Sequence, residues 1–254
     1  MSVKFHIIVA AYNCEKYIRT CLKMLAAQTY KNWDAVIVDD VSTDGTAKII
    51  KTHPIKNVRT VFNTKRVNAL KNQYDAVNLC EPNDEDVIVI VDGDDWLYDS
   101  DSLNILAGHY ENPDVWMTYG RYQEFPSGKI PKHINIPIPK GHDFRRGRWL
   151  TSHLRTCKYF LFKNIFVEDL KSNKTGEFYT ISGDCAVVKP IAEMAGLEHI
   201  KLIKDVLYVY NSSNPIGDGK AHRTLQGIRG KEIALSPVYR KRTKQELING
   251  IKER

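Results

Sequence analysis

The sequence predicts a single α/β domain in which a mostly parallel central sheet is flanked by helices. Two observations lead to this fold class. In the first half of the 254-residue chain, short apolar runs of strand length alternate several times with segments of helical spacing. Residues 87–91 are five β-branched apolar residues in a row, which is typical of a strand buried on both faces of a parallel sheet.

The individual elements follow from the spacing of apolar residues. Apolar runs bounded by polar turn residues predict strands over residues 5–10, 33–38, 58–62, 87–91 and 202–210. Helices are indicated where apolar residues recur three and four positions apart. Cys21, for example, follows Ile18 by three positions and Tyr17 by four. The expected helices are residues 17–25, 46–51, 69–79, 102–110, 151–165 and 185–195, the last of them broken near Pro190.

The second half of the chain is less regular. A long irregular stretch contains Pro126, Pro131, Pro137 and Pro139. Residues 211–222 form a polar loop with two glycines, and the tail from residue 236 onward is basic with a short amphipathic end. Because strands and helices alternate regularly only in the first half, the position of a ligand site is predicted mainly from that half.

The composition fits a globular protein with a basic surface. A net charge of +7 and a sequence pI near 9.0 favour anionic partners such as nucleotides, phosphorylated lipids or a membrane surface. Five cysteines without C-x-x-C spacing predict reduced thiols and no zinc site. No apolar run reaches the roughly 18 residues of a spanning helix, and the start reads as a strand, so we expect a cytoplasmic protein.

Polar side chains follow three of the expected strands, at the point where each strand ends. Tyr12 and Asn13 follow the first strand, Asp39 and Asp40 end the second, and residues 92–95 follow the fourth. In an open parallel sheet, ligands bind beyond the carboxyl ends of the strands. We therefore expect these three clusters to form one site.

The strongest of these signals is the sequence Asp92-Gly93-Asp94-Asp95. Three carboxylates within four residues repel one another unless a cation lies among them. Carboxylate oxygens suit Mg²⁺ or Mn²⁺, which would also bridge the oxygens of a diphosphate. The alternative is a solvated acidic turn in which Asp95 caps a helix. The position at the end of a central strand favours the metal.

Two further acidic positions are candidates. One carboxylate of Asp39 and Asp40 is expected to accept a hydrogen bond from a base N–H or a ribose hydroxyl, although residues 42–45 can also be a plain turn and helix cap. Asp184, at the start of a helix, is a candidate general base. A simple helix cap is the alternative for Asp184, and the local pattern alone favours that alternative.

Basic residues are the remaining candidates. The loop 214–223 carries Lys220, His222 and Arg223 after two glycines, which suits a loop that closes on phosphates, although an ordinary surface loop has the same composition. His153 and Arg155 lie two residues apart on an expected helix, so their side chains should point in different directions.

Taken together, these motifs resemble the family 2 glycosyltransferases. The matching segments are residues 8–13 (IVAAYN), 28–30 (QTY), 36–46 (VIVDDVSTDGT) and 91–95 (VDGDD), and, as in a bacterial and viral branch, 182–184 (SGD), 193–196 (EMAG) and 207–211 (LYVYN). Their order and spacing are more specific than any single segment. The resemblance extends from about residue 4 to about residue 223.

The resemblance implies a GT-A fold and an inverting transfer of a sugar, by direct displacement, from a nucleoside-diphosphate sugar to an acceptor hydroxyl. The donor is expected to be UDP-linked, and the acceptor a glycan, a lipid-linked sugar or a protein. Residues 1–110 would bind the nucleotide sugar, residues 111–235 would bind the acceptor and supply the base, and residues 236–254 form the basic tail. This tail is expected to be a solvated closing helix, or to touch an anionic membrane through Leu247, Ile248 and Ile251.

The resemblance also assigns nucleotide-binding residues. Ala10, Tyr12 and Asp40 match positions that line the nucleoside pocket, with Asp40 facing the base. His222 and Arg223 match a loop that can touch the diphosphate.

The metal and the base are assigned in the same way. Asp94 matches the main metal ligand, which is expected to be Mn²⁺ or Mg²⁺. Asp92 matches a ribose or metal position, and Asp95 a position that shares the metal in some relatives. Asp184 matches the catalytic base.

The chain departs from the family pattern at three points. Relatives often carry Gly where this chain has Val41, and Glu where it has Gly183. They also tend to carry an arginine near Leu70 or Lys71, at the start of the third helix. These departures concern the walls of the expected pocket.

Two other functions are compatible with an acidic site on an α/β sheet. One is a nucleotidyltransferase acting on sugar phosphates, although residues 11–14 lack the Gly-rich, basic loop that such enzymes carry after the first strand. The other is a non-catalytic nucleotide-sugar-binding module. No nucleic-acid partner is expected, because acidic strand ends would repel a phosphate backbone.

Overall fold

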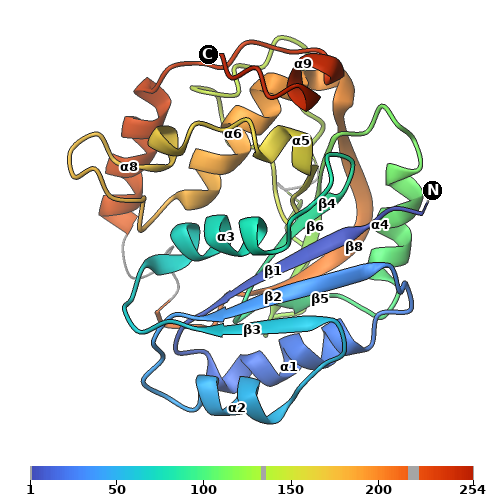
Figure 1. Cartoon of the computed structure of the whole chain (residues 1–254), viewed down its shortest axis with the longest axis vertical. Helices are drawn as coiled ribbons and strands as arrows, with labels where there is room; N and C mark the ends of the chain where they lie inside the picture. Colours follow the sequence, from blue (N-terminus) through green and yellow to red (C-terminus); the bar gives the residue numbers. More distant parts are fainter. Residues whose placement is uncertain (1, 133–135, 217–222, 254) are drawn as a thin grey trace.

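The computed structural model describes residues 2–132, 136–216 and 223–253, and within them eight strands form one sheet with helices on both faces (Figure 1). The strands are β1 (Phe5–Ala11), β2 (Trp33–Asp39), β3 (Val58–Phe62), β4 (Val87–Asp92), β5 (Trp96–Leu97), β6 (Met117–Phe125), β7 (Thr156–Lys158) and β8 (Ile200–Asn211). The helices are α1 (Glu15–Ala26), α2 (Thr46–Thr52), α3 (Asn68–Leu79), α4 (Ser102–Tyr110), α5 (Tyr159–Phe162), α6 (Gly183–Ala195), α8 (Arg223–Leu235) and α9 (Lys244–Ile248), with short 3₁₀ helices η2 (Val167–Leu170) and η3 (Leu197–His199).

The sheet is parallel in its first half and mixed in its second. In the strand order β3-β2-β1-β4-β7-β6-β8-β5, the first four strands are parallel to one another. Strand β7 runs antiparallel between β4 and β6, and β5 is antiparallel to β8. The parallel arrangement predicted from the first half of the sequence therefore holds where β1, β2, β3 and β4 lie.

Strand β1 is covered on both faces, which explains its nearly continuous apolar sequence. Phe5, Ile7 and Val9 belong to the core that includes residues of α1, α2 and α4. Ile8 belongs to the other core, with residues of α3, α5, α6 and α9. Figure 1 shows α1 and α2 on one side of the sheet and α3 and α6 on the other.

The helix predicted over residues 151–165 is wrong for most of its length. Residues 156–158 form β7, which pairs with β4, and the helix α5 is confined to the four residues that follow. The hydroxyl of Thr156 shares hydrogen bonds with those of Tyr110 (2.8 Å) and Thr118 (2.7 Å). Pairing with strands distant in sequence thus outweighs local helical spacing here.

Other elements also differ from the prediction. Strands β5 and β6 were not predicted, and β6 is defined mainly by its long pairing with β8. Helix α6 continues through Pro190 instead of breaking there. Proline removes one helical hydrogen bond, but nearly every residue of α6 from Ala186 to Ala195 is buried, and this packing holds the helix together.

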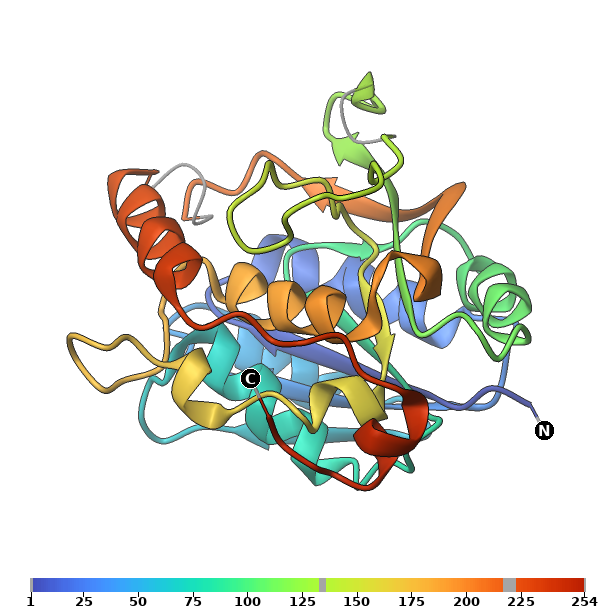
Figure 2. The same cartoon turned by 90° about the horizontal axis from the view of Figure 1, so that it is seen from above.

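The C-terminal tail packs on the domain. After α8 it runs along α6 before it reaches α9 (Figure 2), and the N–H of Arg242 donates to the carbonyl of Met194 (3.1 Å). Leu247 is fully buried and Ile248 packs against the same core, while Ile251 is exposed. The apolar side expected to face solvent or a membrane is therefore turned largely inward.

Two basic residues of the tail form ion pairs with acidic side chains. Arg240 forms ion pairs with Glu246 and Glu253, both at 2.7 Å, and Lys241 forms one with Glu198. Membrane contact, which was the alternative to a solvated closing helix for this tail, stays a prediction. Within the described ranges, no helix is both long enough and apolar enough to cross a membrane.

A buried ion pair ties the irregular segment before β7 to α6. Arg145, 1% exposed, donates from Nε and Nη2 to the two carboxylate oxygens of Glu193 (2.8 and 2.6 Å). The same carboxylate accepts from the N–H of Tyr239 (2.9 Å). One carboxylate thus joins the segment around residue 145, α6 and the chain after α8.

We predict that Glu193→Gln lowers the free energy of unfolding by about 3 kcal/mol, because it leaves the guanidinium of Arg145 buried without its counter-charge. Urea denaturation measures this change. As the control, Asp75→Asn breaks the exposed ion pair between Lys71 and Asp75 and should change the same quantity by less than about 0.5 kcal/mol. Equal effects of the two substitutions would contradict the structural role of the buried pair.

Candidate functional site

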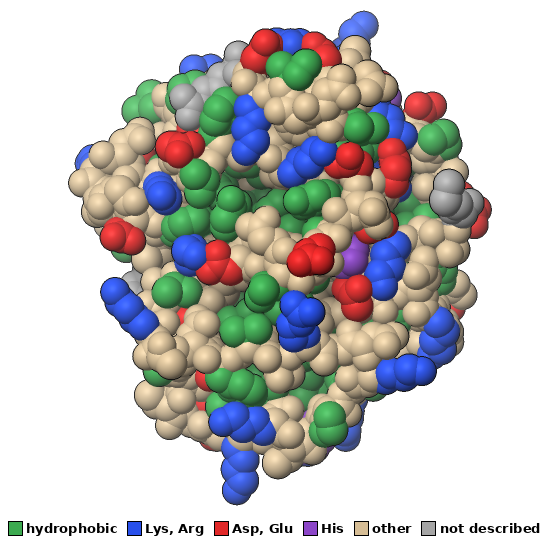
Figure 3. All heavy atoms as spheres, in the orientation of Figure 1, with side chains coloured by type: hydrophobic (Ala, Val, Ile, Leu, Met, Phe, Trp, Pro, Cys, Tyr) green, Lys and Arg blue, Asp and Glu red, His purple; other side chains and the backbone are tan. Residues whose placement is uncertain are grey.

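A cleft of about 530 Å³ lies at the carboxyl ends of β1, β2 and β4, with the starts of α3 and α6 in its wall. The three polar clusters that follow these strands in the sequence all contribute to it. Its volume is in the range of about 300–1,000 Å³ that is typical of small-molecule sites. On the face drawn in Figure 3, lysines and arginines are interspersed with acidic residues, so the net charge of +7 is not gathered there into one basic surface.

One wall of the cleft is formed by Ala10 and Tyr12, which follow from the end of β1. The guanidinium carbon of Arg66 lies 3.6 Å from the centroid of the Tyr12 ring, a cation–π contact. Arg66 is half exposed and also lines the cleft. The sequence analysis missed Arg66, although its position just before α3 is close to where an arginine was expected.

Asp40 is 3% exposed and is held by the segment that enters α3. Its Oδ1 accepts from Asn63 Nδ2 (2.8 Å) and from the N–H of Val67 (3.0 Å), and its Oδ2 accepts from the N–H of Asn68 (2.8 Å). Burial alone would raise the pKa of Asp40, but these hydrogen bonds lower it below its usual value. Asp40 is therefore an anion that fixes the start of α3 at the edge of the cleft.

Asp39 and Asp44, the acidic residues near Asp40, stabilise the turn after β2. Asp39 accepts from the N–H of Ser42 (3.2 Å). Asp44 accepts from the N–H of Thr46 (2.9 Å) and from that of Glu15 (3.1 Å). The turn that was considered as the alternative for residues 42–45 is thus present beside the site.

Asp95 is the most deeply buried acid of the cluster after β4, at 1% exposed. One oxygen accepts from the hydroxyl of Tyr208 (2.8 Å) and the other from the N–H of Asn211 (2.7 Å). Both partners lie on β8, so Asp95 joins the end of β4 to the second half of the sheet. These contacts give Asp95 a structural role, and its role as a metal ligand stays a prediction.

Asp92 and Asp94 line the cleft together with Asp95 and are less deeply buried than Asp95. The amide of Asn214 donates to Asp94 Oδ2 (2.7 Å). Burial raises the pKa of Asp94, and burial together with the charges of Asp94 and Asp92 raises the pKa of Asp95 well above its usual value. The acidic cluster therefore carries electrostatic repulsion that a bound cation would relieve.

Gly93 allows this acidic segment to lie against β1. A Cβ at this position would come within 2.8 Å of the Cα of Ala11. The N–H of Gly93 donates to the carbonyl of Ala10 (2.9 Å). The glycine in the Asp-Gly-Asp-Asp sequence is thus required for the close approach of the two strand ends.

Asp184 lies in the first turn of α6 and lines the opposite side of the cleft. Arg155 Nη1 donates to its Oδ2 (2.9 Å), and the N–H of Cys185 donates to its Oδ1 (2.8 Å). Its side chain remains 40% exposed. The carboxylate is therefore fixed in orientation and accessible from the cleft.

His153 and Arg155 do not diverge, contrary to the prediction that placed them on a helix. They precede β7 in irregular backbone, contact each other through Nε2 and Nη2, and both line the cleft. The ring of His153 stacks on Tyr208, with centroids 4.9 Å apart. Burial and the charge of Arg155 lower the pKa of His153 well below its usual value, so the imidazole is neutral.

Two departures from the family pattern meet in the wall of the cleft. A Cβ at Gly183 would come within 2.9 Å of the Cβ of Leu70. The start of α6 therefore lies directly against α3, and a side chain at residue 183 would displace Leu70. The glycine and the leucine thus fit each other where relatives often carry a glutamate and an arginine.

The expected phosphate-contacting loop is described only in part. Asn214 and Ile216 line the cleft. Lys220 and His222 lie outside the described residues, and Arg223 is placed only by its backbone, as the first residue of α8.

Four non-glycine residues with left-handed backbone surround the cleft: Asn13 (φ 46°), Val41 (φ 63°), Asn68 (φ 68°) and Ser182 (φ 62°). Val41 is the least suited of them, because a β-branched residue is rarely left-handed. Glycine, which the family resemblance leads us to expect at this position, would adopt this conformation without steric strain. Such conformations store strain of about 1–3 kcal/mol each and are concentrated at functional sites.

The comparisons with known proteins agree with this geometry. The model of the family described as glycosyl transferase family 2 matches residues 6–170. Glycosyltransferase GlyA of Streptococcus pneumoniae is 30% identical over 125 residues, which are 48% of this chain and 17% of GlyA. Putative glycosyltransferase EpsE of Bacillus subtilis is 40% identical over 50 residues, which are 20% of this chain and 18% of EpsE. The match thus covers less than a fifth of either relative.

Solved structures resemble the whole fold. TarS of Staphylococcus aureus in complex with UDP-GlcNAc has a TM-score of 0.64 at 20% identity, over 87% of this chain and 62% of that one. The mannosyltransferase PcManGT of Pyrobaculum calidifontis, in complex with GDP-Man and Mn²⁺, has a TM-score of 0.65 at 20% identity, over 94% and 66%. At this identity the likeness concerns the fold, and it confirms the predicted GT-A type of α/β domain.

We predict that Val41→Gly raises the free energy of unfolding by about 1 kcal/mol, because the relief of left-handed strain exceeds the entropy that glycine adds to the unfolded chain. The melting temperature should rise by about 2–4 °C. The control is Val58→Gly, at a partly buried strand position, which should destabilise the protein. Destabilisation by both substitutions would show that Val41 is not strained.

Proposed function

This chain belongs to glycosyl transferase family 2, and on that premise we propose that it transfers a sugar from a nucleoside-diphosphate sugar to an acceptor hydroxyl, with inversion at the anomeric carbon. One observation carries the proposal. A single cleft brings together a polar aromatic wall at Tyr12 and Asp40, the acidic pair Asp92 and Asp94, and the oriented carboxylate of Asp184. These are the three parts that donor binding, leaving-group stabilisation and acceptor activation require.

The nucleoside is proposed to bind beside Ala10, Tyr12 and Asp40. Three N–H groups of the protein donate to Asp40, two of them to Oδ1 and one to Oδ2, and Arg66 Nε lies 3.9 Å from Oδ2. We propose that a base N–H donates to this carboxylate from the side of the cleft. Arg66, over the Tyr12 ring, supplies positive charge beside this pocket for an anionic donor. We propose UDP as the nucleotide, on the resemblance and on the UDP-GlcNAc complex of TarS.

A divalent cation, Mn²⁺ or Mg²⁺, is proposed to bind at Asp94 together with Asp92. The residues fit such an ion, because two carboxylates line the cleft and the cluster is electrostatically strained without a cation. Asp94 and Asp92 are preferred to Asp95, which is the most deeply buried of the three and is already bonded to Tyr208 and Asn211. A bound cation would offset the negative charge that develops on the departing diphosphate. PcManGT was solved with Mn²⁺.

Asp184 is proposed as the general base. It takes the proton from the acceptor hydroxyl as the oxygen attacks the anomeric carbon on the face opposite to the leaving nucleoside diphosphate. Arg155 and the N–H of Cys185 hold the carboxylate in one orientation, so its accessible lone pairs face the cleft. Residues 111–235 would supply this acceptor side, and residues 1–110 the donor side.

We predict that Asp94→Ala weakens metal-dependent donor binding about tenfold or more, because it removes a carboxylate from the cation. Isothermal titration of UDP- and GDP-sugars, each with and without Mn²⁺, measures the effect and identifies the donor. The matched control is Asp75→Asn, which removes an exposed carboxylate on α3. This variant should bind the donor like the wild type. Donor affinity that is independent of both metal and Asp94 would refute the metal assignment.

We predict that Asp184→Asn reduces turnover about 100-fold or more while the dissociation constant of the donor stays nearly unchanged, because the base acts only on the acceptor. The release of nucleoside diphosphate reports turnover, and the same assay separates transfer of a sugar from nucleotidyl transfer, which releases diphosphate. Loss of donor binding in this variant would contradict the assignment of Asp184 as the base.

A further inference from the structure

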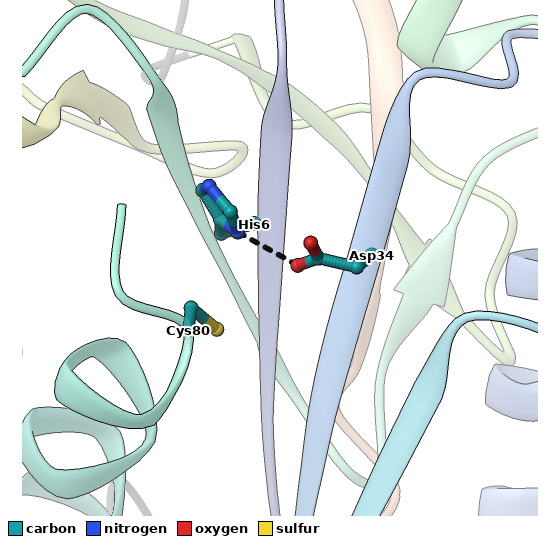
Figure 4. Close-up of side chains that lie close together, drawn as sticks. All are labelled: His6, Asp34 and Cys80. Carbon is teal, nitrogen blue, oxygen red and sulfur yellow. Dashed lines mark hydrogen bonds and ion pairs between the residues drawn. The ribbon is translucent and has the colours of Figure 1, made fainter. Parts of the chain in front are cut away.

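A second cluster of side chains lies at the end of the sheet opposite to the cleft. His6 on β1 and Asp34 on β2 are register partners in the parallel pairing, so their side chains lie on the same face of the sheet. Cys80, directly after α3, approaches the same face. One ligand atom from each of the three residues lies within 4.8 Å of the others. Figure 4 shows the three side chains directed toward one region.

The neighbouring charges orient this cluster. His6 Nδ1 lies 2.7 Å from Asp34 Oδ1, and His6 Nε2 lies 3.1 Å from Asp86 Oδ2. The second oxygen of Asp34 is paired with Lys4 Nζ (2.9 Å), and Asp86 is anchored by the N–H of Asn83 (2.8 Å). Nδ1 of His6 and Oδ1 of Asp34 therefore face each other beside the thiol, while their other polar atoms are already held.

The chemistry of this set differs from that of the cleft. Thiolate, imidazole and carboxylate together are the ligands of Zn²⁺, whereas carboxylates alone suit Mg²⁺ or Mn²⁺. In protein zinc sites, a ligating histidine usually donates its second ring N–H to a carboxylate, which fixes the ring. Asp86 has this relation to His6. Its side chain is nearly buried, as is that of His6, while Asp34 and Cys80 are partly exposed and leave a route for an ion.

We propose that His6 Nδ1, Asp34 Oδ1 and Cys80 Sγ bind Zn²⁺, with Asp86 holding the His6 ring and a water molecule as the fourth ligand. This proposal departs from the prediction of no zinc site, which was made because no C-x-x-C spacing is present and the three ligands are far apart in the sequence. Along β1, His6 lies about 13 Å from Ala10 in the cleft, so this ion is separate from the one that would hold the donor.

Zinc binding here would be structural, since it connects β1, β2 and the end of α3. Binding is an exchange of protons for the metal: the Cys80 thiol loses its proton, and the proton shared between His6 and Asp34 also leaves. No electron is transferred. Because the metal-free cluster is already hydrogen bonded, zinc must replace the contact between His6 and Asp34, and the affinity should decrease at acidic pH.

The test uses the full chain, stripped of metal with EDTA and kept reduced. We expect isothermal titration with ZnCl₂ to give one site per chain, and Co²⁺ to produce the near-ultraviolet absorption band of a thiolate ligand. Cys80→Ser should abolish the band, and Cys80→Ser and Asp34→Asn should each lower zinc affinity about tenfold or more. Asp86→Asn should lower it about tenfold. Zinc should also raise the melting temperature of the wild type.

Two control variants locate the site. Cys185→Ser removes a partly exposed thiol outside the cluster and should keep both the Co²⁺ band and the zinc affinity. Asp94→Ala should also keep both, because its carboxylate lies in the cleft. Absence of zinc binding in the wild type would overturn the proposal. So would a Co²⁺ complex without a thiolate band, a band that survives in Cys80→Ser, or binding that is lost in Asp94→Ala. The wild-type band keeps the proposal testable even if Cys80→Ser does not fold.

Discussion

The hydrogen bonds of Asp95 are the interaction on which the two halves of the domain depend. Its carboxylate accepts from Tyr208 and from the backbone of Asn211, both on β8, while its own backbone belongs to the short turn after the central strand β4. A buried carboxylate is unfavourable without such partners. The hydrogen bonds to this carboxylate fix β8 beside the end of β4. They also bring Asn214, three residues beyond Asn211, to Asp94. Asp95 thus helps to position Asp94, the acid proposed to hold the metal.

The opposite walls of the cleft are set by similar local contacts. Asp40 fixes the entry to α3 through backbone N–H groups, and the absence of a side chain at Gly183 lets α6 lie against Leu70 on that helix. Arg155 then holds Asp184 from the side of β7. The distance between the proposed donor and acceptor sides therefore depends on how α3 and α6 pack together, and residues that never touch a substrate should influence the reaction.

The sequence predicted best where local pattern and tertiary structure agree. Strands β1, β2 and β4 are apolar runs that are buried on both faces, and the polar residues after them meet because parallel strands end at one edge. Strands β6 and β7 were missed because they exist through pairing with distant strands, as Thr156 does with Val89. No pattern separates Asp94 from Asp95, since only the position of β8 and the residues after it decides that Tyr208 and Asn211 bond to Asp95 and Asn214 to Asp94. Arg66 and the cluster of His6, Asp34 and Cys80 likewise depend on packing between segments distant in sequence.

The most direct test of the account is a crystal structure of this chain with UDP and Mn²⁺. We expect the base against Tyr12 and Asp40, the cation between the diphosphate and Asp94, and Asp95 still bonded to Tyr208 and Asn211. A nucleotide bound outside this cleft would contradict the account, as would a cation coordinated by Asp95 after it has left its partners on β8.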